Sequence, residues 1–354
     1  MFAHKPLIAA ILLGSLPGLA LAQAVTSQTI TTQNGSDNEA ILEQRGGWNL
    51  SNQLQQGEGH FSRVEQDGGR NSAQTSQLSL DNHVEVLQSG SANQVTVVQV
   101  SDSFYGHSAS IVQLGAANVA ELEQKEGNGS QATIHQQGSG NTHRVEQLYY
   151  ANRVDSRSSG TDNLTEITQN GAASATTQQF GSNNRITIEQ NVYPYGGGIN
   201  VYQDGTSNEA RVSQYGGRYD TGDVALRQVG SANDAQVVQW GGFSNLTFTQ
   251  DGVGNELTAR QSTRSGTIRG SSVGNDNRVN IDQSFDGPVL DITQNGWANE
   301  IDAVQHVGYG TASISQIGDR NIAVLNQVPG YPLESTSAAI IQNGVGNSAS
   351  IIQR

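Results

Sequence analysis

The sequence contains no cysteine, so no disulfide bond can stabilise its fold. Proline is scarce, with 6 residues among 354, and hydrophobic residues make up only 34% of the chain. This hydrophobic content argues against an ordinary globular domain and, taken alone, would suit a disordered chain. Basic residues are also few, because 18 Lys and Arg stand against 32 Asp and Glu, for a net charge of -14. The absence of any basic cluster argues against a nucleic-acid partner, since phosphate binding requires such clusters.

The first 22 residues have the pattern of a secretory signal peptide. His4 and Lys5 precede an apolar stretch over residues 7–21, and Ala20-Leu21-Ala22 resembles a cleavage site. The alternative, a membrane anchor, is disfavoured because the apolar stretch is too short for a spanning helix. We therefore expect residues 1–22 to be removed and residues 23–32 to form a short N-terminal segment of the mature chain. We expect no part of the protein to insert into a membrane.

A repeat of Gln, Gly and Asn occupies most of the remaining chain. Residues 228–239 show one unit: Gln, then Gly two positions later, Asn five later, a small residue seven later, an aliphatic residue nine later, and Gln again at eleven. Units of this kind run from Gln33 to Gln353 with 29 anchor positions, nearly all of them Gln, and a few short insertions. A disordered chain has no reason to keep such a register, so the repeat indicates an ordered repeat protein.

The spacing within each unit predicts a β-strand followed by a turn. The Asn, the small residue, the aliphatic residue and the closing Gln occupy every second position, and alternate residues of a strand share one face. In one unit this inner set is Asn321, Ala323, Leu325 and Gln327. The Gly lies between the Gln and the Asn, which predicts the turn there.

Consecutive units fall into two classes. Every second unit, starting with the one at Gln44, contains both the Gly and the Asn, whereas the other class has residues such as His60 and His107 in place of the Asn and contains all six length changes. Two units therefore form one coil of about 22 residues, with tight turns along one edge and variable loops along the other. We predict an all-β fold, an amyloid-like two-sheet parallel β-solenoid of about 14 strand-turn-strand coils over residues 33–354, roughly 65 Å long.

Stacked coils place identical side chains above one another, so that Asn and Gln amides hydrogen-bond from coil to coil. This pairing satisfies buried amides that would otherwise cost about 1–3 kcal/mol each. It explains how a chain so poor in hydrophobic residues can fold. The structural ladder that we predict comprises Gln44, Asn49, Gln66, Asn71, Gln88, Asn93, Gln113, Asn118, Gln136, Asn141, Asn163, Gln179, Asn184, Gln203, Asn208, Gln228, Asn233, Gln250, Asn255, Asn277, Gln294, Asn299, Gln316, Asn321, Gln342, Asn347 and Gln353.

The pattern Gln-x-Gly-x-x-Asn-x-Ala-x-x-x-Gln resembles the curlin-repeat family, whose members are subunits of the curli amyloid fibres of bacterial biofilms. Residues 203–214, 228–239, 316–327 and 342–353 match it closely, and the resemblance covers residues 33–354. It implies a secreted structural subunit, major or nucleating, that assembles with copies of itself into extracellular fibres for biofilm matrix and cell adhesion. A second curlin subunit and a curli-type secretion pore are the further partners that the resemblance implies.

Two other functions fit a β-solenoid: an extracellular binding protein that does not polymerise, and a β-helix enzyme acting on carbohydrates. Such an enzyme needs clustered carboxylates and basic residues on long loops. The best candidates here, Asp220 with Arg218 and Asp102 near His107, lie on different coils. The seven His residues show no metal-ligand spacing. We therefore expect no enzyme, and no catalytic, cofactor-binding or metal-binding residues.

The ends of the repeat array also bear on function. Soluble repeat proteins cover their first and last coils with atypical repeats, and exposed strand edges are protected by Pro or Lys. Here the last unit, from Asn347 to Gln353, is among the most regular, and Thr29 to Gln33 is extended and free of Pro and Lys. We expect neither end to be capped, so that copies stack head to tail in an open polymer.

Overall fold

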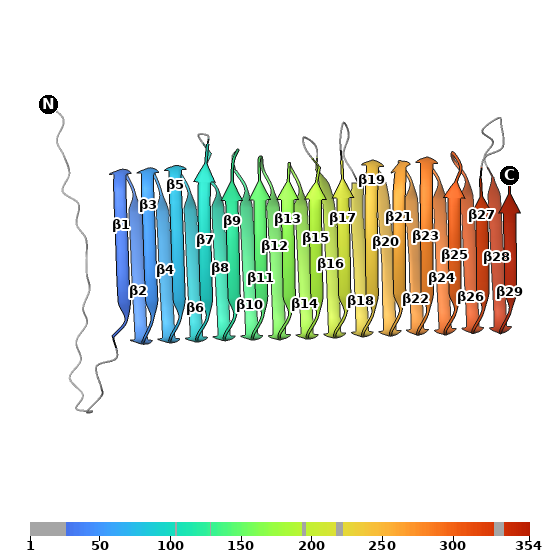
Figure 1. The fold of residues 1–354 in the computed structure, drawn as a ribbon, viewed down its shortest axis with the longest axis horizontal. Coiled ribbons are helices and arrows are strands. Elements are labelled where there is room, and N and C mark those ends of the chain that lie inside the picture. The colour runs from blue at the N-terminus through green and yellow to red at the C-terminus, as the bar shows by residue number, and fades with distance from the viewer. Residues whose placement is uncertain (1–25, 103–104, 128, 193–195, 217–221, 329–335) are drawn as a thin grey trace.

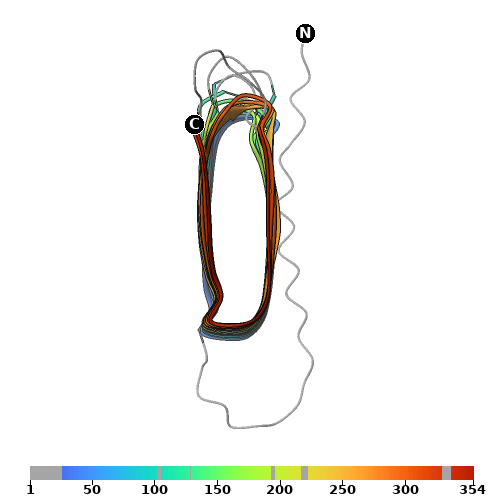
Figure 2. The same ribbon diagram turned by 90° about the vertical axis from the view of Figure 1, so that its right-hand side faces the viewer.

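A computed structural model describes residues 26–102, 105–127, 129–192, 196–216, 222–328 and 336–354. The expected signal peptide, residues 1–22, and the pair Arg218 and Asp220 lie outside these residues. The described residues form two long sheets that face each other across a thin interior (Figures 1 and 2). In this part of the chain, no helix has the length and apolar composition that crossing a membrane requires.

The strands alternate between the two sheets, so that odd-numbered strands form sheet A and even-numbered strands form sheet B. Sheet A has 15 strands: β1 Gln28–Ser36, β3 Leu50–Glu58, β5 Ser72–Leu80, β7 Gln94–Ser101, β9 Val119–Lys125, β11 Thr142–Leu148, β13 Leu164–Asn170, β15 Arg185–Asn191, β17 Glu209–Tyr215, β19 Asp234–Gly242, β21 Glu256–Arg264, β23 Arg278–Asp286, β25 Glu300–His306, β27 Ile322–Gln327 and β29 Ser348–Gln353. Sheet B has 14 strands: β2 Glu39–Gly47, β4 Phe61–Gly69, β6 His83–Ser91, β8 Ser108–Ala116, β10 Gln131–Ser139, β12 Arg153–Thr161, β14 Ser174–Ser182, β16 Gly197–Thr206, β18 Gly222–Ser231, β20 Ser244–Val253, β22 Thr267–Asn275, β24 Val289–Trp297, β26 Thr311–Asp319 and β28 Ser337–Val345.

Each strand pairs in parallel with the strand two further along the chain, which confirms the predicted parallel β-solenoid of about 14 coils. Gln66 lies opposite Gln88 in β6, one coil later. Insertions leave this register unchanged: Gln113 lies opposite Gln88 although 25 residues separate them. The extra residues lie between β7 and β8, at the edge where the loops of different coils diverge in the view along the solenoid axis (Figure 2).

The interior is built from alternate residues of both sheets. Ala323 and Leu325 of β27 are 0% and 1% exposed, while Val324 between them faces outward. The Asn and Gln that flank these residues, Asn321 and Gln327, are both fully buried. The core therefore consists of two narrow apolar layers between layers of buried amides, as the spacing predicts.

The structure differs from the sequence-based expectation at the Gly that recurs in every second unit. We predicted a turn at this residue, but Gly252 is the ninth residue of β20 and pairs with Gly274 of β22. The strand continues through the Gly because the backbones approach closely there: Gly252 has φ 126°, and a Cβ on it would lie 1.9 Å from the carbonyl oxygen of Gly274. The turn itself begins about two residues later, at left-handed residues such as Ala232, with φ 54°.

Candidate functional site

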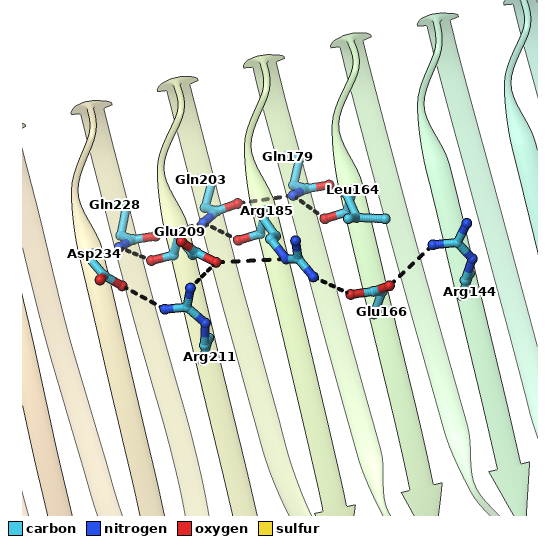
Figure 3. Close-up of polar contacts among 10 residues, drawn as sticks. All are labelled: Arg144, Leu164, Glu166, Gln179, Arg185, Gln203, Glu209, Arg211, Gln228 and Asp234. Atoms are coloured by element: carbon cyan, nitrogen blue, oxygen red, sulfur yellow. Dashed lines mark hydrogen bonds and ion pairs between the residues drawn. The ribbon is translucent and has the colours of Figure 1, made fainter.

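A row of Gln side chains runs along the inside of sheet B. Except where Ser158 and Ser272 interrupt the row, the Nε2 of one Gln donates to the Oε1 of the Gln on the next coil, as from Gln66 to Gln88 at 2.8 Å and from Gln203 to Gln228 at 2.8 Å. The same Nε2 also donates to a backbone oxygen of the other sheet, as from Gln203 to Arg185 at 3.0 Å (Figure 3). Each amide therefore joins neighbouring coils and also joins the two sheets at the edge of the core.

Sheet A contains a second Gln row, which our predicted ladder included only through its last residue, Gln353. The chain of Nε2 to Oε1 bonds starts at Gln33 and reaches Gln353 without interruption: its members are Gln33, Gln55, Gln77, Gln99, Gln124, Gln147, Gln169, Gln190, Gln214, Gln239, Gln261, Gln283, Gln305, Gln327 and Gln353. Their spacing in the sequence was the same as in sheet B. The regular Gln of the unit class with the variable loops is the signal that identifies this row.

The predicted Asn residues form one row along the edge with the tight turns. The Oδ1 of Asn255 accepts bonds from the backbone N and the Nδ2 of Asn277, at 3.2 and 3.0 Å. The Nδ2 of Asn255 also donates to the carbonyl oxygen of Gly274 at 2.9 Å. The bond from backbone N to Oδ1 recurs at every step from Asn49 to Asn347. Each Asn thereby holds the tight turn of its own coil against the next.

On the opposite edge, two His residues occupy Asn positions near the start of the solenoid. The backbone N of His60 donates to Asn38 Oδ1 at 3.1 Å, and His60 Nδ1 accepts from the backbone N of Asn82 at 3.2 Å. Burial lowers the pKa of His60 and of His107, which keeps a ring nitrogen available as an acceptor. His60 therefore accepts from the next coil as an Asn does, whereas His107 joins this row of contacts only through its backbone N, which donates to Asn82 Oδ1, and its buried Nδ1 has no partner among the described residues. The ring of His107, near Asp102, is fully buried.

A buried polar cluster replaces the regular interior where the Gln row of sheet B is interrupted by Ser158. His143 Nε2 lies 2.6 Å from Ser158 Oγ, and His143 Nδ1 lies 3.0 Å from Ser156 Oγ. Ser156 Oγ in turn lies 2.6 Å from Thr177 Oγ1. Burial lowers the pKa of His143 to about 3, so the ring is neutral at pH 7. The cluster is sealed from solvent, which fits a structural role rather than catalysis.

The outer face of sheet A carries a row of charges of alternating sign (Figure 3). Its members are Glu121, Arg144, Glu166, Arg185, Glu209, Arg211 and Asp234, on six successive strands of the sheet from β9 to β19. Arg185 bridges two coils, at 2.8 Å from Glu166 and 3.7 Å from Glu209. All these side chains are partly exposed, so each pair contributes little stability, about 0–1 kcal/mol. The alternation does not separate all like charges, because Asp234 lies in register between Glu209 and Glu256. Burial and these two carboxylates raise the pKa of Asp234.

Both ends of the described solenoid leave ladder groups without a partner in the described chain. At the last coil, Gln342 and Gln353 have no further Gln to which Nε2 can donate, and Asn347 Oδ1 has no further Asn from which to accept. At the first coil, Gln33 and Gln44 donate to the next coil, but no described donor contacts their Oε1. The donors of one end therefore match the acceptors of the other.

The two ends differ in the polarity of their core. Near the first coil, Ser51 and Gln53 occupy positions that are apolar in most other coils, and they lie opposite Thr29 and Thr31 of β1. The last strands instead place apolar side chains there, among them Ala349 and Ile351 of β29, which pack against the core. The first end therefore presents Thr29 and Thr31 beside the apolar Leu42 of β2, whereas the last end presents apolar side chains.

These features define a class of protein: a parallel β-solenoid held together by rows of buried amides and open at both described ends. No group of three or more His, Cys, Asp or Glu that could hold a metal ion occurs among the described residues. The family model of the curlin-associated repeat matches residues 108–138 and 160–191. These two matches support a curlin-repeat protein. A comparison with curated proteins gave no match.

Proposed function

We propose that the protein is a secreted structural subunit that assembles with copies of itself into curli-type amyloid fibres. The observation that carries this proposal is the pair of open ends. The Gln ladders stop with donors at the last coil and acceptors at the first, and the Asn ladder stops with an acceptor, Asn347 Oδ1, at the last coil. A second copy can satisfy these groups by continuing the stack. Parallel in-register strands with amide rows are also the arrangement of cross-β fibres.

The curlin-associated repeat supports the same proposal, because curlin repeats belong to structural rather than enzymatic proteins. The predicted Gln and Asn residues would then have one role along the whole fibre, which is to link successive coils within and between subunits. Residues 1–22 would direct export, and the fibre would serve biofilm matrix and cell adhesion. A second curlin subunit and a secretion pore remain proposed partners by analogy with that family.

The direct test is assembly of the purified chain that begins at residue 23. We expect fibres in electron micrographs, thioflavin-T fluorescence that rises with a lag, and a fibre-diffraction spacing of about 4.8 Å. Addition of preformed fibres should remove the lag. A chain that stays monomeric over a wide concentration range would instead support a binding protein that does not polymerise.

A further inference from the structure

The number of strands constrains how two copies can stack. Along the solenoid axis the strands alternate between the sheets, and of the strands formed by the described residues both the first, β1, and the last, β29, belong to sheet A. If a second copy stacks without rotation, its β1 lies on β29, and one strand position in sheet B stays empty between β28 and the β2 of that copy. An empty position leaves unpaired backbone groups and a gap in the core, both of which are costly.

A half-turn about the solenoid axis removes the gap. Strands run in opposite directions in the two sheets (Figure 1), so a half-turn superposes the direction of sheet A on that of sheet B. The β1 of the second copy then lies on β28, and its β2 lies on β29. We propose that successive copies in the fibre are related by this half-turn, an inference that rests on the proposed self-assembly.

The sequence of β1 fits this position. Gln33-Asn34-Gly35 of β1 aligns with Gln342-Asn343-Gly344 of β28, and the two glycines have φ 126° and 118°. Every strand of sheet B has Gly at this position. In sheet A, among the paired positions of the later strands, only Gly57 and Gly241 are Gly, and the others are residues such as Ser79 or Thr263. The first strand therefore carries the Gly pattern of sheet B, on which the half-turn places it.

The sequence of β2 fits β29 equally well. With Gln44 aligned to Gln353, Leu42 lies on Ile351 and Ala40 lies on Ala349, so the apolar rows of this sheet continue across the junction. In the other sheet, Thr29 and Thr31 lie on Ala338 and Ile340. Asn38, which precedes β2, lies on Asn347, which precedes β29. The Asn row along the edge with the tight turns then continues into the second copy, although Asn38 lies on the edge with the variable loops in its own chain.

The hydrogen bonds match in direction at the same register. The free Nε2 hydrogens of Gln342 and Gln353 point toward the positions of Gln33 Oε1 and Gln44 Oε1 of the second copy, as within the chain. Thr336 Oγ1 is buried and has no partner among the described residues. Thr336 occupies the position that Asn82 occupies in an earlier coil, where Asn82 Oδ1 accepts a hydrogen bond from the backbone N of His107 on the next coil. The half-turn brings the backbone N of Ser27 of the second copy to the equivalent place beside Thr336 Oγ1.

The surface above Gly344 is open in the same way. A Cβ on Gly252 or Gly318 would lie 1.9 or 2.0 Å from the carbonyl oxygen of the next glycine, whereas a Cβ on Gly344 meets only Asn347 Nδ2, at 3.4 Å. The half-turn places the carbonyl oxygen of Gly35 over Gly344. This edge of the last coil therefore has the shape that receives a further Gly of the same row.

Paired cysteines test this arrangement, because the chain has no cysteine of its own. The outward-facing Ser350 of β29 lies beside Ile41 of the second copy after a half-turn, and beside Ile30 without rotation. Neighbouring positions in register have Cα atoms about 4.8 Å apart, within the range for a disulfide bond. The variants are Ser350→Cys with Ile41→Cys, Ser350→Cys with Ile30→Cys, and Ser350→Cys alone, each oxidised as fibres and analysed in denaturant without reductant.

We expect Ser350→Cys with Ile41→Cys to give covalent oligomers at least ten-fold above the other two variants. Preferential cross-linking of Ser350→Cys with Ile30→Cys would overturn the half-turn while leaving self-assembly intact. Dimers from Ser350→Cys alone would indicate that like ends meet, which also overturns it. If wild-type protein forms no fibres, the proposed function fails before this comparison is reached.

A second pair of variants tests the same junction without a cross-link. Gly344→Ala adds a Cβ that meets the second copy only after a half-turn, and Gly346→Ala is its control, because nothing lies within 4 Å of Gly346. Both glycines have positive φ, but Ala298 adopts φ 53° at the position equivalent to Gly346. We expect Gly344→Ala to slow elongation at least ten-fold and Gly346→Ala to elongate like wild type. Equal elongation of the two variants would contradict the proposed register.

Discussion

The ring of Phe248 fills the space left by Gly270 on the next coil. A Cβ built on Gly270 would lie 2.4 Å from Phe248 Cε2, and Phe248 is among the largest fully buried side chains. The two residues occupy successive places in one row of the core, where Leu226 precedes them and Ile292 follows. A large and a small residue thus share the volume of two aliphatic ones, which keeps the two sheets evenly spaced.

This complementarity predicts strong coupling between the two positions. Gly270→Val alone should destabilise by about 1–3 kcal/mol through overpacking, and Phe248→Leu alone by about 1–3 kcal/mol through a cavity. The double variant should be more stable than the sum of the two changes, by about 1 kcal/mol or more. Chemical denaturation of the soluble monomer measures this coupling. Additive changes would show that the two residues do not share a volume.

The Asn row should be essential to stability, whereas outward-facing amides should not. Asn255→Leu removes the acceptor for two donors of Asn277 and the donor to Gly274, and each buried group left without a partner costs about 1–3 kcal/mol. We expect a loss of several kcal/mol in the free energy of unfolding. Asn280→Leu, on the outer face of sheet A, is the matched control and should change the free energy of unfolding by less than about 1 kcal/mol. Similar losses for both variants would mean that the row contributes nothing specific.

The glycines next to the tight turns should tolerate no side chain. Gly252→Val introduces a Cβ into a close backbone contact at φ 126°, whereas Gly254→Ala lies at φ 67°, a conformation that Ala232 already adopts at the equivalent position with φ 54°. We expect Gly252→Val to abolish or slow assembly at least ten-fold and Gly254→Ala to assemble at close to the wild-type rate. Thioflavin-T kinetics at matched concentration provide the measurement, and equal half-times would contradict the close packing of this edge.

His143 should make the middle of the solenoid sensitive to acid. Its pKa is lowered to about 3 in the folded state, below the ordinary value of 6.5, so the unfolded state binds the proton more readily. His143 therefore leaves the free energy of unfolding unchanged above pH 6.5. As the pH decreases from 6.5 to 3, the free energy of unfolding falls by up to about 1.4 kcal/mol per pH unit.

Hydrogen exchange resolved by strand can measure this effect. Protection of β11 and β12 should fall as the pH decreases from 6.5 to 4, after correction for intrinsic exchange. His143→Thr, which introduces the residue found at Thr165 on the next coil, should be less stable at pH 7 but lose this local pH dependence. An unchanged pH dependence in the variant would assign the effect to other groups.

The spacing of the sequence was sufficient to predict the parallel coils, the inner face and the Asn row. It succeeded because each coil repeats the same strand, so that a single unit such as Asn321 to Gln327 defines the contacts of the others. The same spacing misled us about Gly252, which lies within a strand rather than in a turn. Local composition favours a turn at Gly, but the register with Gly274 keeps the backbone in the sheet.

The polar cluster at His143 could not be predicted from any one unit. His143 stands at a position for a small residue and Ser156 at one for an aliphatic residue, so each looks like an isolated exception. Only the register of coils, with its insertions, brings His143, Ser156 and Ser158 together. The charge row could not be read from a constant spacing either, because Arg185 lies in register with Leu164 and not with Glu166, two residues away from the position of the earlier members.

The central claim is that the last coil is the template for the next copy. Ile322 N donates to Asn347 O and Val328 N to Gln353 O, so alternate residues of β29 pair with β27. The backbone N–H and C=O of Ser350, which lies between them, point along the solenoid axis toward the next copy. Ser350→Pro removes an outward N–H and should leave the pairing with β27 intact. Ser350→Val keeps the N–H and is the matched control.

The most direct measurement is the elongation of preformed wild-type fibres by wild-type monomer that contains a small fraction of Ser350→Pro. Our account predicts that the variant joins a growing end through its intact first coil and then blocks it, so that fibre length falls as its fraction rises. Ser350→Val should have no such effect at the same fraction. Fibres of unchanged length and growth rate in the presence of Ser350→Pro would contradict the claim that growth continues the solenoid from its last coil.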